Sequence, residues 1–381
     1  MTRIQPHSAK SKGMPLRVIM AGGGTGGHLF PAIALAQELR RREPDAAILF
    51  VSTGRPFEHA TLARYGFTLM TIPVEGIKGK SLKVRLRAGA KAVQGVAAAR
   101  KIVRRFRPDL MVSVGSYAAG PVGLAGWLAG IPLVLQEQNS VPGITHRMLS
   151  PLARRVYITF AASRAYFPAA KVRLLGNPLR RELVEANSAA PADEADSRPA
   201  GFTVLILGGS QGAHAINEAL VAALSPECRP IQWIHQTGAD DEPWVQRAYA
   251  ALKLNADVRA FFTDVRAVYR KADLVICRAG ASTITEITAL GKPAILIPFP
   301  FAADDHQTRN ARELSNQGAA ETILESELSG PRIAGRIHYY RAHPDQLRRM
   351  GQRAADLGRP QAAREIVDDW RDVLDRPPLA A

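Results

Sequence analysis

The chain has 381 residues, too many for one ordinary hydrophobic core, and 46% of them are apolar, so two domains are expected. Cys228 and Cys277 are far apart in apolar surroundings, which argues against a disulfide framework and favours a reducing compartment. No run of about 18 apolar residues is present, which excludes a membrane-spanning helix. The formal net charge of +16 suits nucleic acid, an anionic membrane or phosphorylated substrates equally.

The N-terminal half opens with a polar leader, residues 1–13, that lacks the apolar stretch of a signal peptide and is predicted to be disordered. An apolar strand (residues 16–21), a glycine turn (residues 22–28), a helix beginning near Pro31 and a second strand (residues 48–52) follow. This order is typical of a doubly wound α/β sheet. Further strands are predicted at residues 108–114, 131–135, 156–159 and 172–175.

The same scheme restarts in the second half, with a strand at residues 202–207 and a glycine turn at residues 208–213. Residues 109–132 and 273–293 also echo each other, which indicates two similar domains rather than a solenoid. A polar, Pro- and Ala-rich stretch separates the halves. The predicted organisation is a leader (1–13), an N-terminal domain (14–178), a linker (179–201), a C-terminal domain (202–358) and a last helix (361–375) packing back on the first domain.

The first glycine turn, Gly22-x-Gly24-x-x-Gly27, matches the dinucleotide-binding fingerprint, but the tip of the second strand has no carboxylate to hold a ribose, which argues against NAD or FAD. The turn remains a candidate anion nest of backbone N–H groups. His28 follows it directly. A lone histidine is more often structural, but a helix N-terminus lowers an imidazole pKa, and a neutral imidazole can accept a proton from a hydroxyl.

A second candidate site is the segment from Arg278 to Glu286, where a strand meets a helix start. Unpaired N–H groups at a helix start favour anions. Glu286 has two open interpretations: a capping box with Thr283, which spacing alone favours, or a carboxylate that holds a sugar hydroxyl.

Three further groups of residues are candidates. Glu137 and Asn139 end an apolar strand, and Tyr117 holds the equivalent place one strand earlier, so they can face a crevice or belong to solvated loops. The run Asp304–Gln307 invites a metal, but no ligand spacing supports one, and hydrogen bonding to a sugar fits better. Residues 76–91 alternate basic and apolar side chains, as in an exposed basic element or a patch on an anionic bilayer. The candidate patch comprises Ile77, Lys80, Leu82, Lys83, Arg85, Leu86 and Arg87.

Taken together, these motifs resemble the family of bacterial peptidoglycan glycosyltransferases that add GlcNAc to undecaprenyl-pyrophosphoryl-MurNAc-pentapeptide (lipid I), which gives lipid II. The similar motifs, in the family's order, are GGTGGH (23–28), EQN (137–139), GNPxR (176–180), GGSQGA (208–213), residues 281–286 and HQxxNA (306–311). The leader, the linker and the C-terminal third carry little of the likeness.

The resemblance implies a GT-B architecture, with two Rossmann-like domains facing a central cleft, and UDP-GlcNAc as donor. It implies that the uracil lies near the backbone of Phe262, the ribose hydroxyls at Glu286, and the pyrophosphate at Ser210 and the helix start. The sugar is expected at Asn139 and Gln307, and Tyr117 on the acceptor side. The remaining donor-site residues that it implies are Thr25, Gly26, Gly27, Arg180, Ala281, Ser282, Thr283, Ile284 and Thr285.

The implied reaction is a single inverting displacement that needs no metal and no cofactor, because helix N-termini and Arg180 can stabilise the leaving UDP. His28 is the first candidate for the base and Glu137 the second. The implied partners are UDP-GlcNAc, lipid I and anionic lipids on the cytoplasmic face of the inner membrane, with other cell-wall proteins open and no nucleic acid. The alternatives are a UDP-GlcNAc 2-epimerase, a glycosyltransferase with a soluble acceptor, an NAD-dependent oxidoreductase and a nucleic-acid-binding protein.

Overall fold

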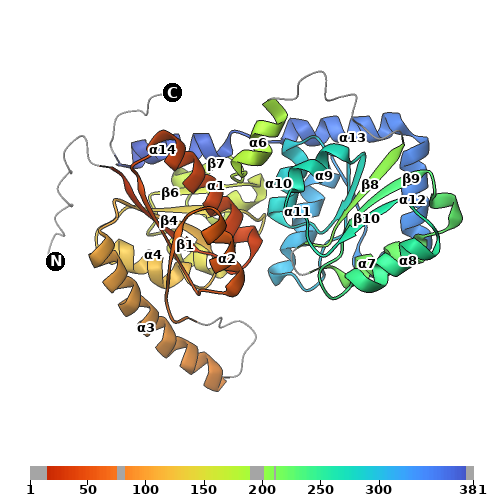
Figure 1. Cartoon of the computed structure of the whole chain (residues 1–381). Coiled ribbons are helices and arrows are strands. Elements are labelled where there is room, and N and C mark those ends of the chain that lie inside the picture. The colour runs from red at the N-terminus through yellow and green to blue at the C-terminus, as the bar shows by residue number, and fades with distance from the viewer. Residues whose placement is uncertain (1–14, 75–81, 189–200, 210–211, 375–381) are drawn as a thin grey trace. The chain divides into compact units, whose positions relative to one another are not determined.

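The computed structural model describes residues 15–74, 93–184, 201–209 and 212–374, together with the backbone of residues 82–92 and 185–188. The chain forms two compact units (Figure 1). Unit 1 comprises residues 1–181 and 361–381, and unit 2 comprises residues 182–360. Each unit is a parallel sheet covered by helices, so the chain contains two Rossmann-like α/β folds.

Within its described residues, unit 1 contains a seven-stranded parallel sheet in the order β3-β2-β1-β4-β5-β6-β7. Its strands are β1 (Arg17–Gly22), β2 (Ala47–Ser52), β3 (Thr68–Thr71), β4 (Leu110–Gly115), β5 (Leu133–Glu137), β6 (Arg155–Ile158) and β7 (Val172–Leu174). Its helices are α1 (Gly26–Arg42), α2 (Pro56–Arg64), α3 (Leu82–Phe106), α4 (Ala119–Leu128), α5 (Ile144–Leu149), α14 (Ala362–Leu374) and the short 3₁₀ helices η1 (Ala161–Tyr166) and η2 (Ala169–Lys171).

The central strands β1 and β4 are buried on both faces of this sheet, which explains why they are continuous apolar runs rather than alternating ones, whereas the edge strand β3 is largely exposed. Met20 points into a core shared with α1 and α14, whereas its neighbour Ile19 points into a second core under α3 and α4. Figure 1 shows α1 with α14 and α3 with α4 on opposite sides of the sheet. Helix α14 contributes Ile366 and Trp370 to the first core and thereby joins the end of the chain to unit 1.

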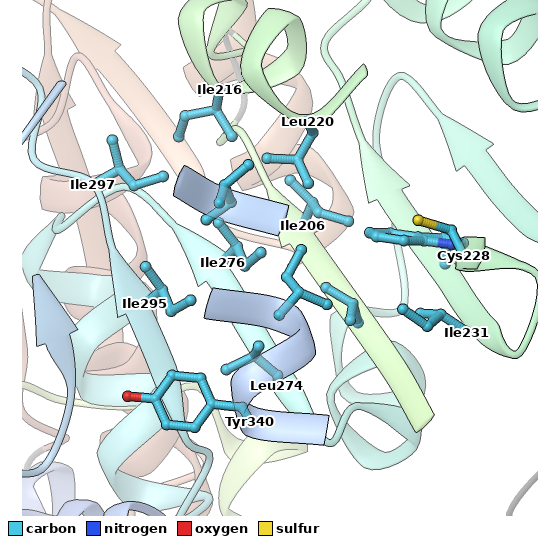
Figure 2. Close-up of a cluster of buried hydrophobic side chains, with 14 of the residues drawn as sticks. Ile206, Ile216, Leu220, Cys228, Ile231, Leu274, Ile276, Ile295, Ile297 and Tyr340 are labelled. Carbon is cyan, nitrogen blue, oxygen red and sulfur yellow. The ribbon is translucent and has the colours of Figure 1, made fainter. Parts of the chain in front are cut away.

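Within its described residues, unit 2 contains a six-stranded parallel sheet in the order β10-β9-β8-β11-β12-β13. Its strands are β8 (Phe202–Leu207), β9 (Ile231–Gln236), β10 (Ala256–Arg259), β11 (Leu274–Cys277), β12 (Ala294–Leu296) and β13 (Glu321–Thr322). Figure 2 shows part of its core, in which Ile206, Ile276 and Ile295 from three neighbouring strands pack together beneath Ile216 and Leu220.

The helices of unit 2 connect these strands and cover the sheet. They are α7 (His214–Ala223), α8 (Glu242–Ala251), α9 (Val265–Lys271), α10 (Ala281–Ala289), α11 (His306–Ser315), α12 (Gly330–Ala342) and α13 (Pro344–Leu357), with 3₁₀ helices η4 (Pro226–Cys228), η5 (Ala303–Asp305) and η6 (Glu325–Glu327). Helix α6 (Arg181–Ser188) precedes the first strand of unit 2 and begins at the last residue of the first segment of unit 1. Helix α6 lies inside the range 179–201 that the sequence predicts as a linker. No helix among the described residues is long and apolar enough to cross a membrane.

The echo between residues 109–132 and 273–293 has a structural counterpart at the start of each central strand pair. The Asp109 carboxylate accepts the backbone N–H of Arg17 at 3.0 Å, and the Asp273 carboxylate accepts the N–H of Thr203 at 2.8 Å. In both units an aspartate that precedes the fourth strand in chain order, β4 or β11, is thus joined to the first strand, β1 or β8. The same aspartate-to-backbone hydrogen bond therefore joins the first and fourth strands in both halves.

Candidate functional site

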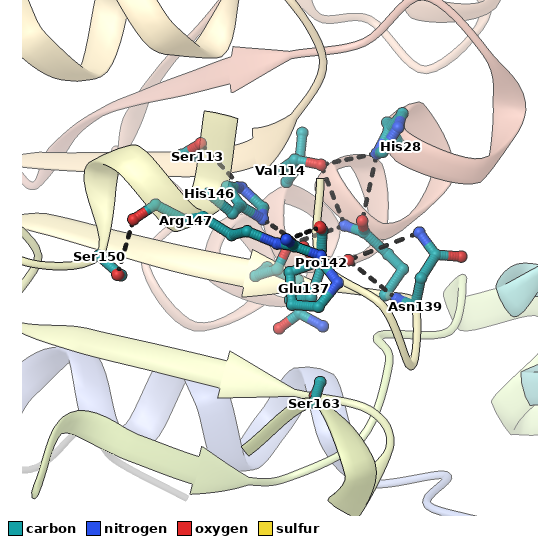
Figure 3. Close-up of polar contacts among 12 residues, drawn as sticks. His28, Ser113, Val114, Glu137, Asn139, Pro142, His146, Arg147, Ser150 and Ser163 are labelled. Carbon is teal, nitrogen blue, oxygen red and sulfur yellow. Dashed lines mark hydrogen bonds and ion pairs between the residues drawn. The ribbon is translucent and has the colours of Figure 1, made fainter. Parts of the chain in front are cut away.

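The order of each sheet reverses beside its first strand, between β1 and β4 in unit 1 and between β8 and β11 in unit 2. In open α/β sheets, ligands bind at the carboxyl ends of the strands near such a reversal. In unit 1 this place holds the first glycine turn, His28 and the end of β5 (Figure 3). In unit 2 it holds the described residues of the second glycine turn, 208–209 and 212–213, and the start of α10.

The first glycine turn is not an open anion nest, because a carboxylate of the chain itself fills part of it. Glu58 is fully buried, and its Oε1 accepts the backbone N–H of Gly24 at 2.6 Å. Its Oε2 accepts the N–H of Arg55 at 2.7 Å. The N–H of Gly23 donates to the Ser116 hydroxyl at 3.2 Å. The N–H groups of Gly23 and Gly24 are therefore engaged within the chain, and the Glu58 carboxylate lies beside them.

His28 lies in the first turn of α1, because that helix begins at Gly26 rather than near Pro31 as predicted. Its Nδ1 lies 2.8 Å from the Val114 carbonyl oxygen and 3.2 Å from Oε1 of Gln138. Both oxygens can only accept, so Nδ1 carries the proton and the neutral ring has an unprotonated Nε2. His28 as a whole residue is half-buried.

The pKa of His28 is lowered, mainly by burial, which disfavours the charged imidazole. The negative charge of Glu137 opposes this effect, and His146 reinforces it. The sequence predicts the lowered pKa but assigns it to the helix N-terminus, whereas burial is the main cause. A neutral imidazole with a bare Nε2 is the form that a general base requires.

Glu137 is buried and both of its oxygens accept hydrogen bonds within the chain (Figure 3). Oε2 lies 2.7 Å from Nδ1 of His146, and Oε1 accepts the backbone N–H of Asn139 at 3.0 Å. Burial alone raises the pKa of Glu137, but the hydrogen bond and charge of His146 hold it below its ordinary value. Through these hydrogen bonds Glu137 fixes the loop that carries Asn139.

The other predicted residues of unit 1 lie around this edge with different exposures. Asn139 is half-buried, whereas Thr25, Gly27 and Tyr117 are exposed. Arg180 stacks its guanidinium over the Phe30 ring at 4.2 Å from the centroid, which places it beside α1. Gly26 is half-buried at the start of α1.

In unit 2, helix α10 begins directly after the Arg278–Gly280 turn, with Gly280 as its N-cap and no side-chain cap. The capping-box interpretation of Thr283 and Glu286 is therefore wrong: Glu286 is the sixth helical residue, and its Oε2 accepts the Tyr269 hydroxyl at 3.0 Å. Ser282, Thr283 and Glu286 are partly exposed, whereas the side chains of Ala281, Ile284 and Thr285 are buried. These three can contact a ligand only through the backbone.

In two further predicted residues of unit 2, a backbone or side-chain amide group already makes a hydrogen bond within the chain. Phe262 is buried, and its backbone N–H donates to Oε1 of Gln236 at 3.0 Å. The Gln236 amide in turn donates to the Gly209 carbonyl, so this side chain links the second glycine turn to Phe262. Oε1 of Gln307 accepts the Phe299 N–H at 3.0 Å and thereby shapes the loop before α11.

Some predicted residues cannot be placed. Ser210, Ile77 and Lys80 lie outside the described residues, as do the side chains of Leu82, Lys83, Arg85, Leu86 and Arg87, although the last five belong to helix α3. Among the described residues, no group of three His, Cys, Asp or Glu side chains is arranged to hold a metal ion.

Sequence reasoning missed Glu58, His146 and Tyr269. Glu58 carries a local signal, because a proline two residues earlier and an acidic residue at the third helical position are typical of a helix start. His146 has no such signal: its partners Ser113 and Glu137 come from two other elements, β4 and β5. Tyr269 reaches Glu286 from α9 in the same way.

Comparison with known proteins gives family matches over both units. Residues 18–158 match the glycosyltransferase family 28 N-terminal domain, and residues 203–366 match its C-terminal domain. A UDP-N-acetylglucosamine–N-acetylmuramyl-(pentapeptide) pyrophosphoryl-undecaprenol N-acetylglucosamine transferase of Trichlorobacter lovleyi is 44% identical over 93% of this chain and 97% of its own. One of the same name from Myxococcus xanthus is 42% identical over 94% and 93%.

Solved structures give the same result. The chain resembles the crystal structure of Acinetobacter baumannii MurG, with a TM-score of 0.75 and 31% identity over 94% of this chain and all of that one. A UDP-N-acetylglucosamine 2-epimerase has a TM-score of 0.65 at 13% identity, which shows a shared fold alone. The predicted α/β class of GT-B type is thus confirmed. The chain is an N-acetylglucosaminyltransferase of glycosyltransferase family 28 and belongs to the UDP-N-acetylglucosamine–N-acetylmuramyl-(pentapeptide) pyrophosphoryl-undecaprenol N-acetylglucosamine transferases.

Proposed function

We propose that the chain transfers GlcNAc from UDP-GlcNAc to the C4 hydroxyl of MurNAc in undecaprenyl-pyrophosphoryl-MurNAc-pentapeptide, with inversion at the anomeric carbon. The family supports the reaction, and the names of the relatives supply donor and acceptor. The observation that carries the mechanism is the orientation of His28, whose Nδ1–H is held by the Val114 carbonyl. Its Nε2 is then free to take a proton.

In this mechanism His28 is the general base. The acceptor oxygen forms a bond to the anomeric carbon, the bond from that carbon to the UDP oxygen breaks, and the hydroxyl proton passes to Nε2 of His28. Because burial lowers the pKa of His28, the ring is neutral near pH 7 and ready for this step. Glu137, the second candidate, is the weaker one, since its carboxylate is buried and bonded to His146 and Asn139.

Unit 2 holds the donor in this proposal. The partly exposed residues Ser282 and Thr283 lie in the first turn of α10, whose N–H groups and dipole favour a pyrophosphate. Glu286 is one turn further along the helix, and Tyr269 orients its carboxylate toward a ribose hydroxyl. Ser210 and Phe262 are the other proposed contacts of the nucleotide, and the carbonyl of Phe262 is the group to consider, because its N–H already bonds Gln236.

Each unit also supplies proposed contacts of the sugar and the leaving group. In unit 1, Asn139, held by Glu137, is a proposed partner of the GlcNAc hydroxyls. In unit 2, Gln307 is proposed for the same role. The leaving UDP gains negative charge as its bond to the sugar breaks. Arg180 and the start of α10 are the proposed stabilisers of that charge, and such preorganised groups are commonly the largest contribution to catalysis. Thr25, Gly26 and Gly27 are proposed to line the donor and acceptor side, and Tyr117 the acceptor side.

We also propose that the chain works at the cytoplasmic face of the inner membrane, where segment 76–91 binds anionic lipids. Its basic residues Lys80, Lys83, Arg85 and Arg87 alternate with Ile77, Leu82 and Leu86. The far end of α3 is anchored, because Ile102 and Val103 are buried in the core of unit 1. A helix fixed at one end and basic at the other can bring the unit to a lipid-linked acceptor. Each basic group near such a surface contributes about 1 kcal/mol.

The test is direct transfer. The purified chain is incubated with radiolabelled UDP-GlcNAc and a lipid I analogue, and label is expected in the lipid product together with one UDP per sugar. Omitting the acceptor controls for hydrolysis. Conversion of UDP-GlcNAc into its 2-epimer without an acceptor, or label that never reaches lipid, would overturn the proposal.

A further inference from the structure

A buried hydrogen-bonded chain, separate from the proposed base, joins the ends of β4 and β5. Ser113 Oγ lies 3.1 Å from Nε2 of His146, and Nδ1 of His146 lies 2.7 Å from Oε2 of Glu137 (Figure 3). All three side chains are buried: Ser113 is 0%, His146 1% and Glu137 2% exposed. His146 comes from α5, so a third element bridges the two strand ends. It has no part in the mechanism described above.

The bridge lies where the strands stop pairing. The parallel register of β4 and β5 runs from Met111 opposite Leu133 to Ser113 opposite Leu135. Beyond Ser113 and Leu135, hydrogen bonds made by side chains join the two strands in place of the backbone ladder. On one side His146 joins Ser113 to Glu137. On the other side Gln138 donates to the Val114 carbonyl at 3.2 Å.

The position of the His28 ring depends on the same two strand ends. Its Nδ1 bonds the carbonyl of Val114, the residue after Ser113, and Oε1 of Gln138, the residue after Glu137. Both imidazoles lie beside Gly115. A Cβ added at this glycine would lie 3.1 Å from Nδ1 of His28 and 3.5 Å from Cε1 of His146. A shift of either strand end would therefore move the base.

We propose that His146 is a positioning residue for the transfer reaction: by joining Ser113 to Glu137 it holds the strand ends that orient His28 and Asn139. Loss of His146 would leave the Glu137 carboxylate buried with only its Asn139 contacts. His28 and Asn139 would then no longer be held in place. This inference depends on the proposed role of His28 as the base. His146 touches no substrate in it, so it acts only through its neighbours.

The test compares His146→Leu, which keeps bulk but no donor, with His146→Asn, whose amide can still donate to Glu137. Each is measured alone and with His28→Ala. We expect His146→Leu to lower kcat on the order of 10- to 100-fold, as small displacements of a reacting group do. His146→Asn should retain more activity. In the His28→Ala background the same changes should cost several-fold less, because the loss that acts through His28 has already occurred and only the loss through Asn139 remains.

Three outcomes would overturn the proposal: a kcat of His146→Leu within 2-fold of wild type, the same factor with and without His28, or equal losses for the Leu and Asn variants. Melting temperatures report whether the variants fold. If His146→Leu does not fold, Ser113→Ala cuts the other end of the bridge, and the same coupling to His28 is expected. A wild-type chain that transfers no label would refute the proposed function instead, whereas a fully active wild type with an indifferent His146 refutes only this inference.

Discussion

Nδ1 of His28 lies 2.8 Å from the carbonyl oxygen of Val114, and this contact decides which nitrogen of the ring can act as a base. We expect His28→Ala to lower kcat by about 10²- to 10⁴-fold, the range that a positioned base contributes. The KM for UDP-GlcNAc should change little, because His28 belongs to the chemical step. Steady-state kinetics with the lipid I analogue measure both constants.

The matched control is His59→Ala, which removes an exposed histidine from the same unit. It should keep wild-type kinetics. A His28→Ala variant that loses kcat and donor affinity by equal factors would assign His28 to binding instead.

The pH dependence of kcat should follow the lowered pKa of His28. The base must be neutral, so kcat rises as pH increases through the pKa of His28 and then levels off. Since burial lowers that pKa, the rise should be centred below 6.5, the ordinary value for histidine. A profile of log kcat between pH 4.5 and 8.5 measures it. A midpoint above 6.5 would mean that the charged ring is stabilised, contrary to the structure.

Glu286→Ala should raise the KM for UDP-GlcNAc strongly while leaving the fold intact, because a carboxylate that binds the ribose is lost. Tyr269→Phe removes only the hydroxyl that donates to Glu286 and should raise KM less. Glu327→Ala serves as control, since that carboxylate pairs with Arg332 at the surface. Unchanged KM in a folded Glu286→Ala variant would remove Glu286 from the donor site.

Much of the fold follows from local sequence patterns. The continuous apolar runs predicted the central strands, and the stripe of Ile366, Val367 and Trp370 predicted the last helix. The two glycine turns marked the two strand-to-helix junctions because they require conformations that suit glycine: Gly24 has φ +91° and Gly209 has φ +81°. These signals are contained within a few neighbouring residues.

The candidate site was less predictable, because its contacts join distant segments. Glu58 meets Gly24 across 34 residues, and Ser113 meets His146 across 33, so no spacing rule reveals either pair. The capping-box prediction failed for the opposite reason: the spacing of Thr283 and Glu286 is right, but Gly280 is the N-cap and α10 begins two residues before Thr283. Only the end of the preceding strand fixes where that helix starts.

Glu58→Gln tests the carboxylate within the first glycine turn. Glu58 accepts two backbone N–H groups, and an amide has only one accepting oxygen and must place its NH₂ against a donor. Because hydrogen bonds to a charged group are worth about 1.5–3 kcal/mol, we expect a loss of unfolding free energy of that order in urea titrations. The kcat should fall too, since the turn leads directly into His28.

The control for this change is Glu365→Gln, an exposed position on α14 in the same unit. It should alter neither stability nor kcat. If Glu58→Gln were as stable as wild type, the carboxylate would not be what closes the turn.

The membrane proposal is tested by reversing the charge of Lys80, Lys83, Arg85 and Arg87 to Glu. The variant should no longer sediment with vesicles that contain anionic lipid, because about 1 kcal/mol of attraction per basic residue becomes repulsion. Its activity on a short, water-soluble acceptor should persist, because segment 76–91 acts only by bringing the enzyme to the lipid. The matched control reverses four exposed arginines of unit 2, Arg341, Arg348, Arg349 and Arg353, and should still bind. Equal vesicle binding by both variants would show that overall charge, rather than segment 76–91, brings the chain to the bilayer.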